Sequence, residues 1–371
     1  MIGIDLFAGP GGLSEGAEQA GVEVRLAVES EPNAIATYAR NHPNTRIFAY
    51  DIRKLREIGI DPLGHTSIIF GGPPCQGFST SNQKTRNLAN PDNWLFLEFL
   101  RIVKLWMPDW VLFENVPGIA GTKGGFFLEQ LNNGLKRYGY TCSNWILNAA
   151  DYGVPQLRNR FFVLGSLHGI SVKAPKPSLI KYVTVNEAIA DLPILQNGAS
   201  TNWMPYRSDA QSAYSRLLRG NALESPNHLV TRNSPLVIER YRYISEGGNW
   251  ESIPNELMGN YRNRSRCHTR IYYRLRNDAP SVVIGNYRKN MLIHPTQDRG
   301  LSVREAARLQ SFGDWYEFCG TIGFQQQQVG NAVPPLLARA VFEAILSYDS
   351  SGKRLSSARL SPERRMSVCV V

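Results

Sequence analysis

The chain has 371 residues, of which 43 % are hydrophobic and 19 % charged, and a formal net charge of +10. A chain this long buries a core that needs no disulfide staples, and its five cysteines are too scattered for a disulfide framework or a zinc-ligand spacing. The sequence begins directly on a strand pattern, without a basic signal region or a long apolar span. These features predict a soluble protein of a reducing, cytoplasmic compartment, with no metal and no membrane association.

The first 165 residues alternate between strand and helix patterns. Strands are expected at 2–7, 23–28, 46–50, 67–70, 110–113, 141–147 and 161–165. Helices are expected at 13–20, 32–41, 94–106 and 126–138, the second with a proline near its first turn. Strands that alternate with helices indicate an α/β fold with a doubly wound, mostly parallel sheet.

This alternation stops between residues 175 and 300, where connections rich in Pro, Ser and Asn predict a second, loop-rich domain. A helix is expected to restart at 302–309, because Ser302 and Glu305 have the spacing of a capping box. The last expected helix, 334–348, is long and apolar enough to pack back on the first domain. The polar, basic tail at 350–371 is expected to be disordered.

Charge is distributed unevenly along the chain. Residues 1–130 carry 11 Lys and Arg against 14 Asp and Glu, whereas residues 131–310 carry 24 against 12. Many of these basic residues are arginines interleaved with tyrosines, a combination that suits phosphate contacts and base stacking. The pattern favours a polyanionic partner over a merely solvated basic face. The arginines concerned are Arg232, Arg240, Arg242, Arg262, Arg264, Arg266, Arg270, Arg274 and Arg276.

A lone cysteine follows strand 67–70 in the segment GGPPCQGFS at 71–79. Pro73 and Pro74 fix φ and bar a helix, while the flanking glycines permit conformations that other residues resist. Cys75 is therefore held at the carboxyl end of a strand, the edge at which open α/β sheets bind ligands. The pattern predicts a nucleophile, with a small buried hydrophobic residue as the alternative.

A glycine-rich turn, FAGPGG at 7–12, joins the first strand to the first helix. Its spacing is not that of a dinucleotide fingerprint, and it lacks the lysine of a phosphate-binding loop. Glu29 and Asp51 end the next two strands, and a carboxylate at the end of the second strand commonly binds ribose hydroxyls. The set predicts a nucleoside cofactor without phosphates, although each acid alone is also typical of a helix cap.

Two further motifs lie at strand ends. Glu114 follows strand 110–113, and a carboxyl group in an apolar pocket keeps its proton because desolvation raises its pKa. In QLRNR at 156–160, alternation puts Arg158 and Arg160 on the same side, and a buried arginine needs an accepting partner. These side chains are candidates for holding a ring substrate, with an ordinary ion pair as the alternative for one of the arginines.

Eight segments, in order, resemble the motifs of cytosine-5 DNA methyltransferases of the bacterial restriction-modification type. The similarity covers nearly the whole chain, and eight matches in their expected structural contexts argue strongly against coincidence. The segments are DLFAGPGG at 5–12, Glu29, DI at 51–52, GPPCQ at 72–76, ENV at 114–116, QLRNR at 156–160, REAARLQ at 304–310 and QVGNAVP at 328–334.

The resemblance implies S-adenosylmethionine as methyl donor, S-adenosylhomocysteine as product, and no metal. It also implies a Rossmann-like catalytic and cofactor-binding domain of residues 1–177 and 323–349, and a target-recognition domain of residues 178–322. The cofactor-binding residues that it implies are Phe7, Ala8, Gly9, Gly11, Gly12, Leu13, Glu29, Ser30, Asp51, Ile52, Pro74, Asn331, Ala332 and Val333.

The reaction that the resemblance implies begins with a cytosine flipped out of the duplex. Cys75 would attack carbon 6 of that base, which makes carbon 5 able to accept the methyl group. Glu114 would hold or protonate ring nitrogen 3. Arg160, supported by Arg158, would hold the ring carbonyl oxygen.

Two alternatives stay open at this stage. One is the same reaction on RNA, although the Cys-Phe-Thr tripeptide usual in the related transfer-RNA enzymes is missing. The other is a catalytically silent nucleic-acid-binding relative, which would have no reason to keep Cys75, Glu114 and Arg160. The expected partner is double-stranded DNA, with a cognate restriction endonuclease linked by function rather than by contact. The chain is expected to act as a monomer in the bacterial cytoplasm.

Overall fold

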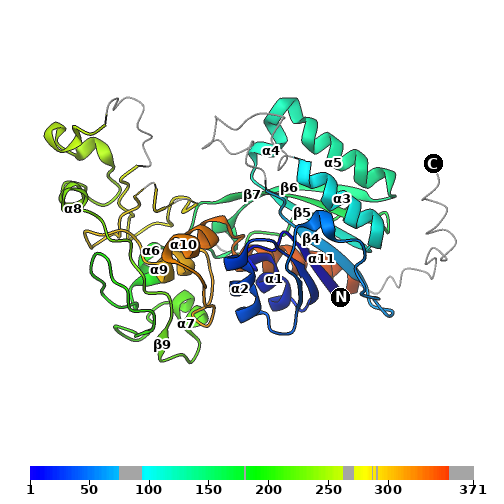
Figure 1. The fold of residues 1–371 in the computed structure, drawn as a ribbon, viewed down its shortest axis with the longest axis horizontal. Coiled ribbons are helices and arrows are strands. Elements are labelled where there is room, and N and C mark those ends of the chain that lie inside the picture. The colour runs from blue at the N-terminus through cyan, green and yellow to red at the C-terminus, as the bar shows by residue number, and fades with distance from the viewer. Residues whose placement is uncertain (75–93, 179–180, 262–270, 286, 290, 351–371) are drawn as a thin grey trace.

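The structure is a computed structural model that describes residues 1–74, 94–178, 181–261, 271–285, 287–289 and 291–350. Within them the chain forms two lobes, a sheet flanked by helices and a second lobe of short helices and long connections (Figure 1). The tail expected to be disordered lies outside the described residues, apart from Ser350, which ends the last helix.

Seven strands form the sheet of the first lobe in the order β3-β2-β1-β4-β5-β7-β6. The first five strands pair in parallel, while β7 is antiparallel to both of its neighbours. This confirms the predicted doubly wound, mostly parallel sheet, whose strand order reverses between β1 and β4. The strands are β1 (Ile2–Leu6), β2 (Glu23–Val28), β3 (Arg46–Phe48), β4 (Ser67–Gly71), β5 (Trp110–Asn115), β6 (Thr141–Asn148) and β7 (Asn159–Ser166).

Helices cover both faces of this sheet (Figure 1). One face packs against α3 (Leu95–Trp106) and α5 (Phe126–Arg137), and the other against α1 (Gly12–Gln19) and α11 (Pro335–Ser350). The predicted return of the last helix to the first lobe is therefore confirmed. The remaining helical segments of this lobe are α2 (Pro32–Asn41), α4 (Gly118–Gly121), η1 (Ile52–Lys54), η4 (Thr122–Gly125) and η5 (Ala149–Tyr152).

The second lobe has its own hydrophobic core, built around α9 and α10. Its α9 begins with the predicted capping box, in which Ser302 and Glu305 each accept a hydrogen bond from the other's backbone N–H. Helix α10 is absent from the sequence prediction because its run of four glutamines hides any apolar period. The elements are α6 (Val185–Ile189), β8 (Met204–Pro205), α7 (Ala213–Arg219), β9 (Glu224–Ser225), α8 (Pro235–Arg242), η6 (Trp250–Ser252), η7 (Asn255–Met258), α9 (Val303–Leu309) and α10 (Ile322–Asn331).

Among the residues that the structure describes, the stretch Ile322–Asp349 is long and apolar enough to cross a membrane, because an 18-residue window within it has a mean hydropathy of 1.3. The expectation of no long apolar span is therefore wrong on length and composition. Within the structure 61 % of that window is buried, and α11 packs against α1 on a face of the sheet. This degree of burial is typical of helices that pack in a hydrophobic core.

Two of the arginines expected to contact a polyanion are instead buried inside the second lobe. Arg240 donates to the carbonyl of Leu257 at 2.8 Å and to the Tyr272 hydroxyl at 2.7 Å. Arg274 donates to the carbonyls of Ile244 and Tyr241. The expectation is wrong for this pair because their donors are used up by backbone and side-chain acceptors of the lobe. Arg232, Arg242 and Arg276 are exposed, and Arg262, Arg264, Arg266 and Arg270 lie outside the described residues.

Candidate active site

A buried ion pair lies across two neighbouring strands at the carboxyl end of the sheet. Arg160, the second residue of β7, places its Nε 2.8 Å from Oε1 of Glu114, near the end of β5. Both residues are only 8 % exposed. Burial raises the pKa of Glu114, an effect that the charges of Arg160 and Arg158 only partly offset. The site therefore holds a buried carboxyl group with a raised pKa beside a fixed cation.

The end of the neighbouring strand β4 is fitted closely around this carboxylate. A methyl group at Gly72 would lie 2.5 Å from Oε2 of Glu114, so the absence of a side chain makes room for the acid. The side chain of Asn115 donates to the carbonyl of Pro73 at 3.1 Å. The Pro73–Pro74 turn is thus fixed beside Glu114, directly before Cys75. Cys75 itself lies outside the described residues, and so does its predicted position at the strand end.

Arg158 points to a different part of the site from Arg160. Its Nη2 donates to the carbonyls of Gly330 at 2.9 Å and Ala332 at 3.1 Å, and the residue is 1 % exposed. Gln156 joins the same cluster by donating to the carbonyl of Leu309 and the side chain of Gln310. The two arginines of the QLRNR motif therefore have different partners. Arg160 pairs with Glu114, whereas Arg158 anchors the segment that carries Asn331 and Val333.

The glycine-rich turn leaves β1 with an unusual backbone. Phe7, Gly9 and Gly11 all have positive φ, of 61°, 56° and 95°. Phe7 is the one of the three that pays a steric penalty, since L side chains avoid this region. A methyl group at Gly12 would collide with the carbonyl oxygen of Val333. The structure thus brings together two of the segments expected to bind the cofactor, which lie more than 300 residues apart in sequence.

Glu29 contributes to the same turn. Its carboxylate accepts from the backbone N–H of Gly9 at 2.8 Å, and its other oxygen accepts from the N–H groups of Ser30 and Glu31. The acid at the end of β2 therefore fixes the turn after β1. The open space around the Cα of Gly9, where a side chain would meet nothing within 4 Å, leaves room beside it for a ligand.

The other expected cofactor residues differ in exposure. Asp51 caps η1, accepting from the backbone and side chain of Arg53. Ile52 is buried in the core of the first lobe, and Leu13 packs in the core between the sheet, α1 and α11. The buried members are Ala8, Leu13, Ile52, Ala332 and Val333, and the exposed ones are Ser30, Pro74 and Asn331.

Asp5 is a buried group at this site that the sequence prediction did not single out. It is fully buried in β1 beneath the glycine-rich turn and accepts from the Ser14 hydroxyl at 2.7 Å, while its Oδ1 has no protein partner. Burial raises its pKa well above the usual range. The sequence did carry a signal for this residue, because Asp5 is a charged residue inside an otherwise apolar strand.

One group of described residues has ligand atoms close enough together to suggest a metal. Glu15, Glu18 and His42 place three such atoms within 4.8 Å of one another. Both ring nitrogens of His42 already have hydrogen-bond partners, and Glu15 accepts from Gln19. The group is a hydrogen-bonded cluster, and it supports no metal assignment.

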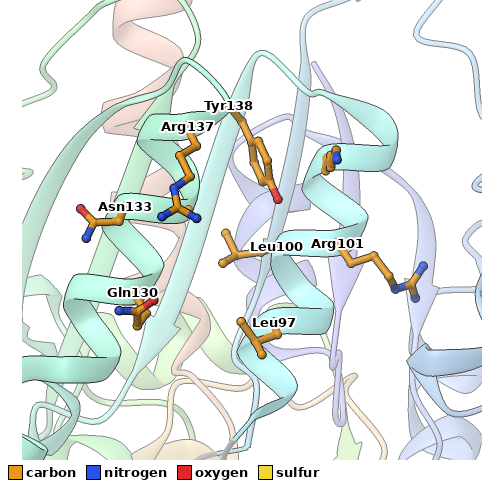
Figure 2. Close-up of a pocket in the computed structure, with 9 residues that line it drawn as sticks. Leu97, Leu100, Arg101, Gln130, Asn133, Arg137 and Tyr138 are labelled. Atoms are coloured by element: carbon orange, nitrogen blue, oxygen red, sulfur yellow. The ribbon is translucent and has the colours of Figure 1, made fainter. Parts of the chain in front are cut away.

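A hollow lies away from these residues, between α3 and α5 (Figure 2). Leu97 and Leu100 line it from α3, and Asn133 and Arg137 from α5. The Arg101 guanidinium points away from it and donates to the carbonyls of Ile52 and Leu55. Because none of the predicted site residues lines this hollow, it is not part of the candidate active site.

Residues 1–347 match the family described as C-5 cytosine-specific DNA methylase. The chain belongs to this family. It is 37 % identical to Type II methyltransferase M1.HphI of Haemophilus parahaemolyticus, over 94 % of this chain and 87 % of the relative. It is 33 % identical to Type II methyltransferase M.DdeI of Desulfomicrobium norvegicum, over 97 % and 92 % of the two chains.

Solved structures agree with this membership. A protein described as a DNA modification methyltransferase encoded within an E. coli prophage matches with a TM-score of 0.75 and 28 % identity, over 94 % of this chain and 99 % of the other. The S. pombe Dnmt2 methyltransferase matches with a TM-score of 0.56 over 94 % and 99 %; at 16 % identity it supports the fold alone. The methylase family transfers a methyl group from S-adenosylmethionine to carbon 5 of cytosine in DNA, and base flipping and a covalent adduct are general features of it. The predicted family, fold class and reaction are confirmed.

Proposed function

We propose that Cys75, Glu114 and Arg160 carry out the methylation of a cytosine that has been flipped out of duplex DNA. The observation that supports this best is the buried Glu114–Arg160 pair, one strand away from the rigid Pro73–Pro74 turn that leads into Cys75. A donor, a cation and a nucleophile are the three groups that an addition to the cytosine ring requires.

The Cys75 thiolate forms a bond to carbon 6 of the ring, and the electrons displaced by this addition make carbon 5 nucleophilic. Only the thiolate has this reactivity. Because the usual pKa of a thiol is near 8.5, the surroundings of Cys75 must favour its ionised form. Bound S-adenosylmethionine would supply an electrophilic methyl group to carbon 5, and the bond from that methyl group to sulfur would break to leave S-adenosylhomocysteine. Once carbon 5 carries the methyl group it loses its proton to a base, the bond from carbon 6 to sulfur breaks, and Cys75 is regenerated.

Glu114 and Arg160 stabilise the charge that develops as sulfur adds. Because burial raises the pKa of Glu114, this group can hold a proton for ring nitrogen 3. Arg160 can donate to the ring carbonyl oxygen from a position fixed by Glu114 and by its bond to the carbonyl of Asn159. Arg158 takes a positioning role in this proposal, since its donors face the carbonyls of Gly330 and Ala332.

The cofactor site proposed here runs along the glycine-rich turn. Glu29 offers its carboxylate to the hydroxyl groups of a ribose, Asp51 would lie beside the adenine ring, and both acids disfavour a phosphate by like charge. The positive φ values of Gly9 and Gly11 let the backbone approach a ligand closely. Phe7, Ile52 and Pro74 offer apolar contacts to an adenine ring. Asn331, Ala332 and Val333 would close the methionine end against Gly12, with Ala8, Leu13 and Ser30 completing the site.

The second lobe is proposed to hold the DNA. In this assignment residues 1–177 and 323–349 form the catalytic domain and residues 178–322 the target-recognition domain, so that α10 belongs to the catalytic domain by sequence while it packs in the core of the second lobe. Exposed basic side chains such as Arg232 and Arg242 would contact phosphates, and this binding energy offsets the few kcal/mol that base flipping costs. We further infer a monomer that acts on DNA in the bacterial cytoplasm, alongside a restriction endonuclease of the same specificity that it does not contact.

The test is methyl transfer from labelled S-adenosylmethionine to unmethylated duplex DNA of diverse sequence, with mapping of the 5-methylcytosine formed. We expect label in one short motif, abolished in Cys75→Ser. In Glu114→Gln we expect methyl transfer to fall by about 10²- to 10⁴-fold, because a positioned proton donor is lost while cofactor binding remains. Activity close to wild type in either variant would remove that residue from the proposed mechanism.

An RNA substrate is the competing outcome of the same experiment. Parallel incubations with transfer RNA and duplex DNA distinguish the two, because label in RNA alone would reassign the substrate. No transfer to either nucleic acid by protein that binds the cofactor would instead favour a silent nucleic-acid-binding protein.

A further inference from the structure

A tyrosine from the second lobe reaches the glycine-rich turn of the first lobe. Tyr316 is fully buried, and its ring packs against those of Phe312 and Phe318, with centroids at 4.7 and 5.5 Å. Its hydroxyl makes a short hydrogen bond to the carbonyl oxygen of Pro10, 306 residues earlier in the chain. Segments near the beginning and near the end of the chain are therefore joined at one backbone atom of the turn, the carbonyl oxygen of Pro10.

The direction of this hydrogen bond follows from the groups involved. A carbonyl oxygen only accepts, so the Tyr316 hydroxyl must donate its one proton to Pro10. Burial raises the pKa of Tyr316 well above the usual range, which keeps that proton on the oxygen. The hydroxyl oxygen also lies 3.0 Å from Nε2 of His42, within hydrogen-bond distance. His42 is held in turn by Glu18, whose carboxylate lies 2.9 Å from Nδ1.

The turn is shaped to fit against this pair of side chains. A methyl group at Gly11 would lie 2.6 Å from Nε2 of His42 and 2.7 Å from the Tyr316 hydroxyl. The residue before Pro10, Gly9, has its N–H bound by Glu29. Two adjacent residues of the turn are thus held by different parts of the protein, one from the end of β2 and one from the second lobe.

The segment that carries Tyr316 is itself fixed to α2. The Asn41 side chain donates to the carbonyl of Glu317 at 2.9 Å and accepts from its N–H at 2.9 Å. The N–H of Cys319 donates to the Thr37 hydroxyl at 2.8 Å. These bonds hold the tyrosine in register with the turn, so its hydroxyl is a preorganised support rather than a chance contact.

We propose that Tyr316, oriented by His42, is a positioning residue that holds the glycine-rich turn in its cofactor-binding conformation. The inference rests on the proposed function, in which this turn binds S-adenosylmethionine. Without the hydroxyl, the Pro10 carbonyl loses its buried partner, and the turn with its left-handed residues relaxes in the free protein. Cofactor binding must then restore the turn's conformation, which weakens affinity without touching the reacting atoms.

The test is Tyr316→Phe, which removes one oxygen and keeps the ring. We expect the Kd for S-adenosylmethionine, measured by titration calorimetry, to rise about 5- to 30-fold. The kcat at saturating cofactor is expected to stay within about 2-fold of wild type, because the interaction does not change between ground and transition states. Tyr214→Phe is the matched control, since Tyr214 is also buried in the second lobe and its hydroxyl donates to the carbonyl of Arg308, away from the turn.

A double-mutant cycle separates positioning from general stability. If His42 acts through the tyrosine, His42→Asn weakens cofactor binding in the wild-type background and adds little to Tyr316→Phe. Full additivity, or equal cofactor affinities in Tyr316→Phe and Tyr214→Phe, overturns the inference. His42→Asn with unchanged affinity overturns it as well, even if Tyr316→Phe does not fold. Failure of the wild-type protein to bind S-adenosylmethionine would instead overturn the proposed function.

Discussion

Gly72 is a residue at which the active site leaves little room for change. A side chain there would press on Oε2 of Glu114, and Glu114 is held on its other side by Arg160. We predict that Gly72→Ala displaces the carboxyl group and lowers methyl transfer at least about 100-fold, since a misplacement of about 1 Å is enough for such a loss. Cofactor affinity should change far less, because the glycine-rich turn is untouched.

The control for this variant is Gly121→Ala in α4, where an added methyl group meets nothing within 4 Å. It is expected to keep wild-type activity. Steady-state kinetics of both variants measures the methyl-transfer rate, and cofactor titration measures the affinity for S-adenosylmethionine. Gly72→Ala with a methyl-transfer rate like that of Gly121→Ala would contradict the prediction.

Residues at strand ends were the predictable part of this site. Glu114, Arg160 and Glu29 each follow or begin an apolar run, and parallel strand ends share one edge of a sheet. The different partners of Arg158 and Arg160 were not predictable, because alternation puts two side chains on one side without saying what each meets. The bond from Tyr316 to Pro10 has no local signal at all, since its two residues meet only through the packing of the lobes.

At the scale of elements, α1 packs closely against α11. A methyl group at Gly16 would collide with Cβ of Ala338 and lie 2.5 Å from the carbonyl oxygen of Pro335. In an exposed helix, replacing glycine by alanine stabilises by about 1 kcal/mol. Here we predict the opposite sign, a loss of about 1–3 kcal/mol in the free energy of unfolding, because backbone cannot move aside as a side chain can.

The matched substitution is Gly134→Ala in α5. Its new methyl group would lie 2.6 Å from Cδ1 of Leu100, the far end of a flexible side chain. Rotation of that side chain relieves the contact, so we expect a change within about 1 kcal/mol. Urea unfolding of both variants provides the comparison. Equal free energies of unfolding for Gly16→Ala and Gly134→Ala would show that the contact at Gly16 is no tighter than the contact at Gly134.

The elements that sequence predicted best are those with strong apolar runs. Strand 23–28 and helix 32–41 agree with the structure at both ends, and the capping box of α9 was identified from two residues. Helix α10 was missed because Gln325, Gln326 and Gln328 are buried by hydrogen bonding rather than by apolarity. The helices α6 and α7 have capping boxes too, at Thr184 and Ser212, but they are too short for an apolar period to show.

For the molecule as a whole, the number of arginines overstates the basic surface. Arg299, Arg304 and Arg308 are buried in the second lobe, paired with Glu305, Asp191 and Asp314. Together with Arg240 and Arg274 they stabilise a lobe that has little regular secondary structure. The sequence identified the arginine-rich region but not this role, because burial depends on the packing of distant segments. DNA binding must therefore depend on a smaller, exposed set of basic residues.

The pair of Arg299 with Glu305 makes the stability of this lobe depend on pH. Burial alone would raise the pKa of Glu305, but the charge and hydrogen bonds of Arg299 outweigh it and lower the pKa to about 2, from an ordinary value of 4.5. A carboxyl group whose pKa is depressed on folding contributes stability above its unfolded pKa and loses it as the pH falls through the folded value. The contribution is therefore full at pH 7 and declines between about pH 4.5 and 2.

We predict that Glu305→Gln lowers the free energy of unfolding at pH 7 by about 3 kcal/mol, since it leaves the Arg299 guanidinium buried and unpaired. The difference from wild type should shrink as the pH falls from 4.5 toward 2, and urea unfolding at a series of pH values measures it. The control is Glu343→Gln, which breaks the exposed pair with Arg339 on α11 and should change stability little at any pH. A deficit in Glu305→Gln that stayed constant across this pH range would mean that the glutamate stabilises the lobe by its shape and hydrogen bonds rather than by its charge.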